Sequence, residues 1–169
     1  TGQSAHDILS ISESETTAYL YIAAGLDGLI AVRFNRETGS LQKTQQRKTV
    51  GINYPINGIA YNFNDTLYLA GGNGIYTSKF ENNEFNNPRS LTKVFDTPTT
   101  ANNGIDFNNN TKNLACAHEN GTITVWDSAA ILNESWSVYM NAPALDIILL
   151  DDYIYATVET NLNFGGIRI

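Results

Sequence analysis

The chain has 169 residues, a formal net charge of -7 at neutral pH and an apolar fraction of 42%. This length and apolar content are sufficient for one domain with a hydrophobic core, which argues against disorder as the dominant state. The ten Lys and Arg residues are scattered along the chain. Because nucleic-acid affinity depends on clustered basic side chains, we expect no nucleic-acid partner. No segment reaches the roughly eighteen apolar residues that a membrane span requires.

Residues 5–56 predict a first unit of three apolar strands followed by a polar one. The four strands correspond to AHDILSI, AYLYIAAG, GLIAVRF and SLQKTQQRKTV. Between the second and third strands, Asp27 and Gly28 offer the positive-φ residues that a tight hairpin needs. The polar fourth strand is expected at the outer edge of a sheet, facing water.

The same order of strands returns in residues 57–102 and 103–143, and in a shorter form in residues 144–169. The first strands read NGIAYNF, NGIDFN and ALDIILL; the second read TLYLAGG, NLACAHE and YIYATVE; the third read GIYTSKF, GTITVWD and GGIRI. SLTKVFDT and ESWSVYM supply polar fourth strands to the two complete units. A repeat of roughly 40 to 50 residues is typical of propeller blades.

We therefore predict an all-β fold, a β-propeller of four-stranded antiparallel blades, in a single domain at 1–169. Its blades are expected at 5–56, 57–102, 103–143 and 144–169, the last one truncated. A β-sandwich would also give short strands, but it does not explain the repeated units. Because the last unit lacks a fourth strand, we expect an incomplete ring, either part of a propeller of about six to eight blades or one completed by other segments. A self-contained four-bladed ring is the least favoured alternative.

Three short runs resemble known propeller families. LACAHENGTITVWD, in the third unit, resembles the WD-repeat blade, with a small-residue second strand, a glycine turn and a third strand that ends in Trp-Asp. AYLYIAAGLDGLIAVRF resembles the LVIVD-type repeat of bacterial surface propellers, and FNRETGSLQ is similar to a connecting turn of lactonase-like propellers. The WD resemblance implies a hydrogen-bonded set of a His before the first strand, a Ser or Thr on the second, a turn Asp and the Trp. Only Trp126 and Asp127 match this pattern.

Residues suited to catalysis are few. Cys116 is the only cysteine and lies in the apolar run LACA, which is typical of a small buried hydrophobe rather than of a nucleophile. His6 and His118 are the only histidines, so any His-based catalytic or metal site must use one of them. No nucleophile-elbow serine, phosphate-binding glycine loop or calcium-loop spacing occurs. We therefore name no catalytic residue and expect no cofactor.

The function we favour is a non-catalytic scaffold that binds another protein through the loops on one face of the propeller. The candidate contact residues are polar or aromatic and lie at turns and strand entries: Asp27, Tyr54, Asn57, Asn73, Asn103, His118 and Glu119. His118 and Glu119 are expected in an exposed turn. The scaffold hypothesis predicts a broad, acidic face dotted with aromatic residues and without a deep polar pocket. The sequence leaves the compartment open, with the cytoplasm slightly favoured over the cell surface or secretion.

The alternative function is a propeller enzyme or sugar-binding module, such as a lactonase-like hydrolase, with a site at the central channel. His6 and Asp7 lie at the start of the first innermost strand, and Asp146 holds the equivalent place in the fourth unit. The enzyme hypothesis predicts that these three side chains converge within metal-ligand distance of one another.

Overall fold

The computed structural model describes residues 4–47, 54–79, 91–127, 133–151, 153–159 and 166–168. Within these residues the protein is all-β, with four antiparallel sheets and no helix, and the sheets do not close into a ring. The fold class predicted from the repeated units is therefore confirmed. None of the described residues forms a helix that could cross a membrane.

Each sheet is a meander in which strands that are consecutive in the chain are neighbours. We call the four sheets blades 1 to 4. Blade 1 consists of β1 (Asp7–Ser12), β2 (Thr17–Ala23), β3 (Leu29–Asn35) and β4 (Leu41–Arg47). Blade 2 consists of β5 (Ile56–Tyr61), β6 (Thr66–Gly71), β7 (Gly74–Lys79) and β8 (Thr92–Asp96). Blade 3 consists of β9 (Asn102–Phe107), β10 (Asn113–His118), β11 (Thr122–Asp127) and β12 (Asn133–Tyr139). Blade 4 consists of β13 (Ala144–Leu149), β14 (Ile154–Val158) and β15 (Gly166–Arg168).

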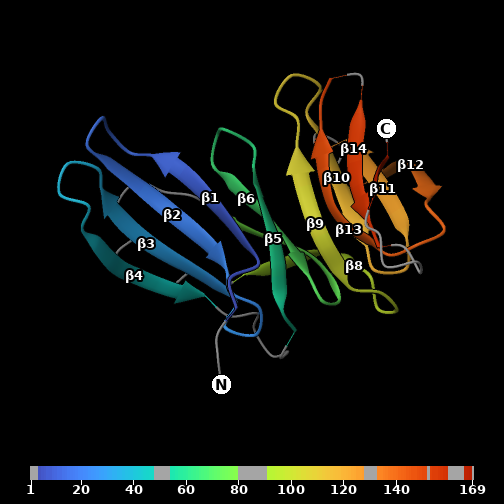
Figure 1. The fold of residues 1–169 in the computed structure, drawn as a ribbon, viewed down its shortest axis with the longest axis horizontal. Helices are drawn as coiled ribbons and strands as arrows, with labels where there is room; N and C mark the ends of the chain where they lie inside the picture. Colours follow the sequence, from blue (N-terminus) through green and yellow to red (C-terminus); the bar gives the residue numbers. More distant parts are fainter. Residues whose placement is uncertain are drawn as a thin grey trace.

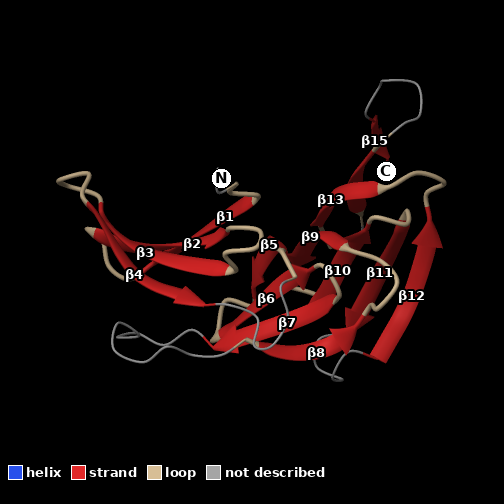
Figure 2. Cartoon of the chain, turned by 90° about the horizontal axis from the view of Figure 1, so that it is seen from below, coloured by secondary structure: helices blue, strands red, loops and turns tan. Residues whose placement is uncertain are grey.

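The blades follow one another in chain order along an open arc, as the blue-to-red colouring of Figure 1 shows. Their first strands, β1, β5, β9 and β13, are the innermost, and each contacts the first strand of the next blade. Figure 2 shows the same succession of sheets from below. Among the described residues, blades 1 and 4 lie at the two ends of the arc.

The hydrophobic core lies between blades, in three separate clusters. The cluster between blades 1 and 2 is rich in large side chains such as Tyr21 and Leu69. The cluster between blades 2 and 3 surrounds the fully buried Trp126. The cluster between blades 3 and 4 uses small residues such as Ala115 and Ala117. Each blade therefore depends on its neighbours for burial, as in other repeat architectures.

Polar side chains on the innermost strands tie consecutive blades together. Asp7 Oδ2 accepts a hydrogen bond from the backbone N–H of Ile59 at 2.8 Å. In the same way, Asp106 Oδ2 accepts one from Leu149 at 2.8 Å. Asn57 spans from blade 2 to blade 3, where its amide nitrogen donates to the Asn102 carbonyl at 2.9 Å. These contacts fix the relative height of the blades, and with it the position of the loops at the ends of the strands.

Candidate functional site at the channel mouth

A cavity of about 410 Å³ opens at the end of the arc where the innermost strands begin. Residues from all four blades line it: His6, Asn57, Asn103, Glu119, Pro143, Leu145 and Glu159. We call it the channel-mouth cavity. It is more polar than the face that the scaffold hypothesis predicts, because loops of several blades bring their polar side chains to one place.

The two carboxylates of the channel-mouth cavity, Glu119 and Glu159, occupy equivalent backbone positions in blades 3 and 4. The residue just after the second strand donates its N–H to a carbonyl before the first strand, as Glu119 does to Ala101 and Glu159 to Pro143, both at 2.9 Å. In blade 2 the equivalent residue is Gly72, which donates to Pro55 at 2.9 Å. A Cβ on Gly72 would lie 2.7 Å from Pro55 Cδ, so this blade has no room for a side chain there. Blades 3 and 4 therefore each contribute one carboxylate.

The lining offers mainly hydrogen-bond acceptors. Asn57 and Asn103 donate through Nδ2 to the backbone of the next blade, at 2.9 and 2.8 Å, which leaves each Oδ1 able to accept from another molecule. Within the described part of the chain, no Lys or Arg forms an ion pair with Glu119 or Glu159. His6 Nε2 lies 2.9 Å from Ser4 Oγ. Such a lining suits a ligand that carries positive charge and several N–H donors.

Three aspartates on the innermost strands form a second group of acidic residues. Burial raises the pKa of the Asp106 carboxyl, and the neighbouring charges of Asp146 and Asp7 raise it further. Burial also raises the pKa of Asp146, and the charge of Asp7 adds to this effect. Asp106 was not among the residues predicted from sequence. The signal was available, because NGIDFN places this Asp on a predicted innermost strand.

His6, Asp7 and Asp146 do not form the metal site that the enzyme hypothesis predicts. Among the described residues, no three His, Cys, Asp or Glu side chains are grouped so that they could hold a metal ion. His6 lines the channel-mouth cavity, whereas Asp7 accepts hydrogen bonds from backbone N–H groups of blades 1 and 2. Asp146 accepts one from the N–H of Ile147 at 2.8 Å. The prediction that His6, Asp7 and Asp146 converge as ligands is wrong, because two of them stabilise the innermost strands.

The residues predicted to contact a partner fall into three groups. Asn57, Asn103 and Glu119 lie together in the lining of the channel-mouth cavity, beside His6. Asp27 and Tyr54 lie in loops at the same end of the blades but do not line the cavity. Tyr54 is 40% exposed and its ring packs close to Gly72. Asn73 and His118 are buried.

His118 is the last residue of β10 and is only 4% exposed. Its Nδ1 lies 2.7 Å from Asn102 Oδ1, and its Nε2 lies 3.0 Å from Thr124 Oγ1. Asn102 Nδ2 donates to the Gly71 carbonyl and to Thr97 Oγ1, so its Oδ1 must be the acceptor for His118. Nδ1 therefore carries a proton, and Nε2 shares a hydrogen bond with the Thr124 hydroxyl. The expected exposed position is wrong, because His118 satisfies buried polar groups.

Asn73 is buried for a similar reason. It is 7% exposed, and its side-chain oxygen accepts a hydrogen bond from the hydroxyl of Tyr76. Its backbone carbonyl accepts from the N–H of Thr97 at 3.1 Å. Turn residues were expected to face water, but in this blade the turn folds back onto the third and fourth strands.

Blade 3 thus contains a hydrogen-bonded set that differs from the set implied by the WD pattern. His118, Thr124 and Asn102 form it, and the ring of Trp126 lies edge-on to His118 with 6.3 Å between centroids. The histidine comes from the end of the second strand instead of preceding the first. Cys116 also joins the set, since its buried thiol lies 3.7 Å from Asn102 Oδ1, and burial raises the pKa of that thiol.

The residues of the cavity that sequence reasoning missed are Pro143, Leu145 and Glu159. For Glu159 a signal exists in the repeats. YIYATVE ends in the same position as NLACAHE, from which Glu119 was selected. Pro143, just before β13, and Leu145, within it, carry no such signal, because an apolar residue at an innermost strand is expected in the core.

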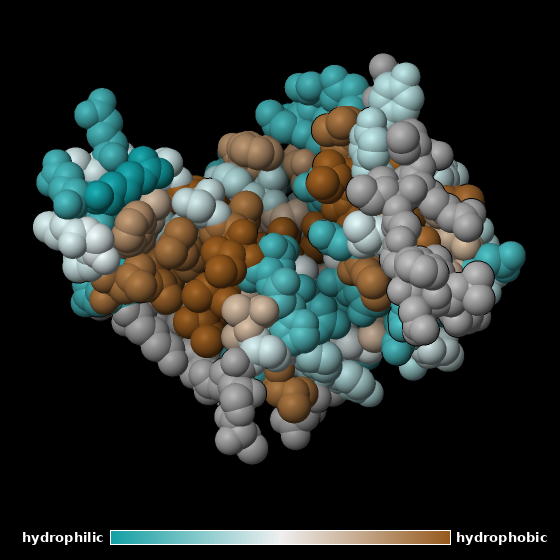
Figure 3. All heavy atoms as spheres, in the orientation of Figure 1, coloured by the Kyte–Doolittle hydropathy of each residue, from teal (hydrophilic) through white to brown (hydrophobic). Residues whose placement is uncertain are grey.

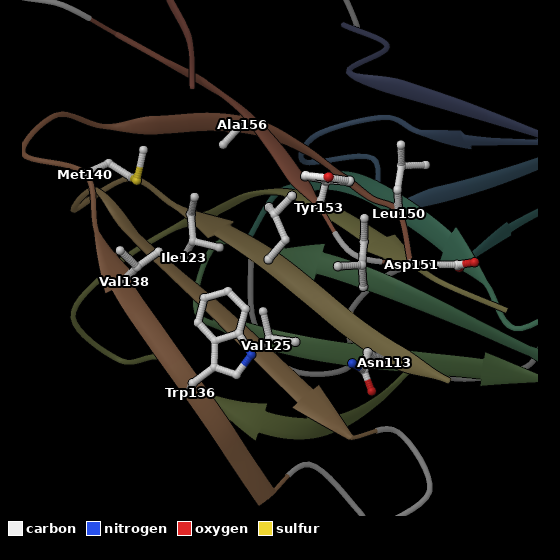
Figure 4. Close-up of a pocket in the computed structure, with 12 residues that line it drawn as sticks. Asn113, Ile123, Val125, Trp136, Val138, Met140, Leu150, Asp151, Tyr153 and Ala156 are labelled. Atoms are coloured by element: carbon white, nitrogen blue, oxygen red, sulfur yellow. The ribbon is translucent and has the colours of Figure 1, made fainter. Parts of the chain in front are cut away.

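A second cavity, of about 470 Å³, lies between blades 3 and 4 and is lined mainly by apolar side chains. Figure 4 shows Trp136 and Val138 on one wall, with Tyr153 and Leu150 opposite. In the described part of blade 4, β15 pairs with β14 over Ala156–Val158. We call this cavity the interblade groove.

No family model matches the sequence, and a search of curated proteins finds no relative. Solved structures do match. Sqt1 of Saccharomyces cerevisiae, a WD40 propeller protein, superposes with a TM-score of 0.69 at 15% identity, over 92% of this chain and 44% of its own. The computationally designed Ika4 protein superposes with a TM-score of 0.59 at 12% identity, over 99% of this chain and 92% of its own. At these identities the likeness shows a propeller-like fold. The chain spans less than half the length of Sqt1.

Proposed function

We propose that this protein is a protein-interaction propeller that binds a partner through the channel-mouth cavity. The observation that carries the proposal is the lining itself, to which four blades contribute acceptors and two carboxylates. The likeness of the fold to Sqt1 is consistent with this class of protein. Propeller loops at one end of the blades form a continuous surface on which several repeats can contact one partner.

The partner surface that fits best is a basic segment with Lys or Arg side chains. A guanidinium or ammonium group between Glu119 and Glu159 would find two carboxylates, and the free Oδ1 atoms of Asn57 and Asn103 would accept its remaining N–H groups. The net charge of -7 would attract such a segment at long range. Leu26 and Tyr54, which are 67% and 40% exposed, lie in loops at the same end and offer apolar contacts around the charged centre.

Charge reversal at the cavity tests the proposal. The double variant Glu119→Lys, Glu159→Lys is compared with Glu15→Lys, Glu37→Lys, which makes the same change in charge at the opposite end of blade 1. Each protein is immobilised and proteins retained from an extract of the source cells are quantified by mass spectrometry. We expect a basic partner that the wild type and the control retain and that the cavity variant loses by about tenfold or more. Equal retention by all three proteins, or by none, would contradict the proposal.

A further inference from the structure

A third cavity, of about 330 Å³, lies where the innermost strands end, away from the channel mouth. The second halves of β1 and β5, the β5–β6 turn and the end of β9 line it, through side chains that include Leu9, Ile11, Tyr61, Phe63, Asp106 and Phe107. We call it the turn-end cavity. We propose that it binds a small organic cation with an aromatic body, whose ring packs on the apolar walls while its ammonium group pairs with Asp106. The site lies apart from the channel-mouth cavity, so this inference goes beyond the function proposed above.

The walls of the turn-end cavity are mainly apolar and are held by the core. Leu9 and Ile11 pack against the cluster between blades 1 and 2. Phe107 is 7% exposed, and its ring stacks on that of Tyr68 with 5.9 Å between centroids. Small-molecule sites are mostly apolar cavities of about 300 to 1,000 Å³ with a few polar groups. The turn-end cavity is at the lower end of this range, which suits a ligand of one ring with a short chain.

Phe63 belongs to this lining in a conformation that is unfavourable for its side chain. Its φ is 58°, in the left-handed region, where a bulky residue is a rare outlier. The side chain is also 68% exposed, so little hydrophobic burial offsets the strain. Figure 3 shows hydrophobic atoms, in brown, at the tip of the β5–β6 hairpin, which lies at the upper edge of Figure 1.

A polar residue is sufficient at this place, as the corresponding turn of blade 3 shows. There Asn109 lies at the same distance from the end of the first strand as Phe63 does in blade 2. The two turns are of a similar kind, because Asn62 and Asn108 both accept backbone N–H groups of their own turn through Oδ1. Local strain that the turn does not require is typical of ligand-binding sites. We therefore assign Phe63 to the contact with a ligand.

Hydrogen bonds order the turn that carries Phe63. Asn62 Oδ1 accepts from three backbone N–H groups of the turn, each at 3.0 Å. The Tyr61 hydroxyl donates to the Asn64 carbonyl at 2.9 Å, and the rings of Tyr61 and Phe63 lie 5.6 Å apart between centroids. Both rings are therefore in place before a ligand binds, which lowers the entropic cost of binding.

The charge of the turn-end cavity favours a cation. Each oxygen of Asp106 accepts one backbone N–H, from β9 at 2.9 Å and from β13 at 2.8 Å, and a carboxylate oxygen can accept a second donor. Among the described residues, no Lys or Arg forms an ion pair with Asp106. The charges that act on it are those of Asp146 and Asp7, which are negative and raise its pKa. An ammonium group would reduce this repulsion, and the faces of the two aromatic rings also attract cations.

Titration of the 169-residue chain with phenethylammonium, followed by proton–nitrogen NMR of the backbone amides, tests the proposal. We expect saturable shifts at Phe63, Asn64 and Phe107, with a dissociation constant of about 1 mM or lower. Hydrocinnamate has the same ring and chain but ends in a carboxylate, so it should bind about tenfold more weakly or worse. Equal binding of the two compounds, shifts confined to the channel mouth, or no saturable shift would each overturn the proposal.

Phe63→Asn tests the aromatic contact. Asn tolerates a positive φ, so the melting temperature should be unchanged or higher. The affinity for phenethylammonium should fall by about fivefold or more, because one aromatic wall is lost. Tyr139→Asn removes an aromatic side chain that is 65% exposed and lies outside the cavity, so this control should bind like the wild type. Unchanged affinity in Phe63→Asn would overturn the proposal.

Asp106→Asn tests the charge. It should weaken the binding of phenethylammonium by about tenfold and reduce its advantage over hydrocinnamate. Asp27→Asn makes the same change in net charge at the opposite end of the blades and should keep the wild-type ratio of the two affinities. A wild-type ratio in Asp106→Asn would overturn the proposal. Thermal unfolding checks that this variant is folded, and the Phe63→Asn experiment does not depend on it.

Discussion

The buried histidine of blade 3 stabilises the fold through hydrogen bonds. His118→Ala removes a hydrogen-bond partner from the Thr124 hydroxyl and from Asn102 Oδ1, which keeps only the weak contact of the Cys116 thiol. It also opens a space beside Trp126. Buried groups left unsatisfied, together with a cavity, lower the free energy of unfolding by about 2–4 kcal/mol. Urea unfolding of the variant measures this loss.

The neighbouring residue provides the control. Glu119 is exposed and follows His118 directly, so Glu119→Ala should change the free energy of unfolding by no more than about 0.5 kcal/mol. An equal loss of unfolding free energy in the two variants would contradict the prediction, because the hydrogen bonds of His118 would then add no stability.

The aspartates of the innermost strands give a second prediction at the scale of single residues. The pKa of Asp106 is raised first by burial and then by the charges of Asp146 and Asp7. Asp146→Asn should therefore lower the pKa of Asp106, because it removes one of the charges that raise it. Carbon-13 NMR of the carboxyl groups during a pH titration measures this shift. An unchanged or higher pKa in the variant would contradict the prediction, and Asp27→Asn, in the β2–β3 turn, is the control.

The direction of the shift determines how Asp106 affects stability. A carboxyl whose pKa is higher in the folded than in the unfolded state lowers stability when it is ionised. The unfavourable effect of Asp106 on stability therefore decreases as the pH falls through its folded-state pKa. It disappears once the pH is below the ordinary pKa of an Asp carboxyl. Asp65 behaves in the opposite way, because its hydrogen bond from Lys79 is the main cause of a lowered pKa. Its contribution is present at neutral pH and is lost on acidification.

At the scale of the strand, the sequence is sufficient to predict most elements. The run TLYLAGG predicts β6, and NLACAHE predicts β10, with ends that differ from the structure by about one residue. These predictions succeed because strand length, turn residues and the repeat all agree. The burial of His118 and Asn73 was not predicted, because it depends on partners such as Asn102 and Tyr76 that only the folded blade brings close. For the candidate site, sequence identified four of the lining residues but not their common cavity.

The contacts between innermost strands depend on glycines that allow close approach. A Cβ on Gly104 would lie 2.6 Å from Asp146 Oδ1 and 2.7 Å from Asp146 Cα. A Cβ on Gly58 would meet its nearest atoms, in blade 3, only at 3.2 Å. Gly104→Ala should therefore force β9 and β13 apart and cost about 1–3 kcal/mol, more than Gly58→Ala. Thermal or urea unfolding of the two variants measures both losses of stability. An equal loss, or a larger loss in Gly58→Ala, would contradict the prediction.

At the scale of the whole molecule, stability should be distributed along the arc, because the core consists of three clusters between blades. In such an arrangement a defect weakens the blades on either side of it more than distant ones. Leu69→Ala removes a fully buried side chain from the cluster between blades 1 and 2. Hydrogen exchange followed by mass spectrometry should then show faster exchange in β2 and β6, while β10 and β11 of blade 3 keep most of their protection.

A substitution in the cluster at the other end of the arc tests whether the effect on hydrogen exchange is local. Val125→Ala lies in the cluster between blades 3 and 4, so it should accelerate exchange in β11 and β14 and spare β2. A uniform increase of exchange in all four blades, with either variant, would mean that the arc unfolds as a single cooperative unit. The local result is expected because the extensive contacts of the described strands join consecutive blades, and hydrophobic burial is lost where such a contact is removed.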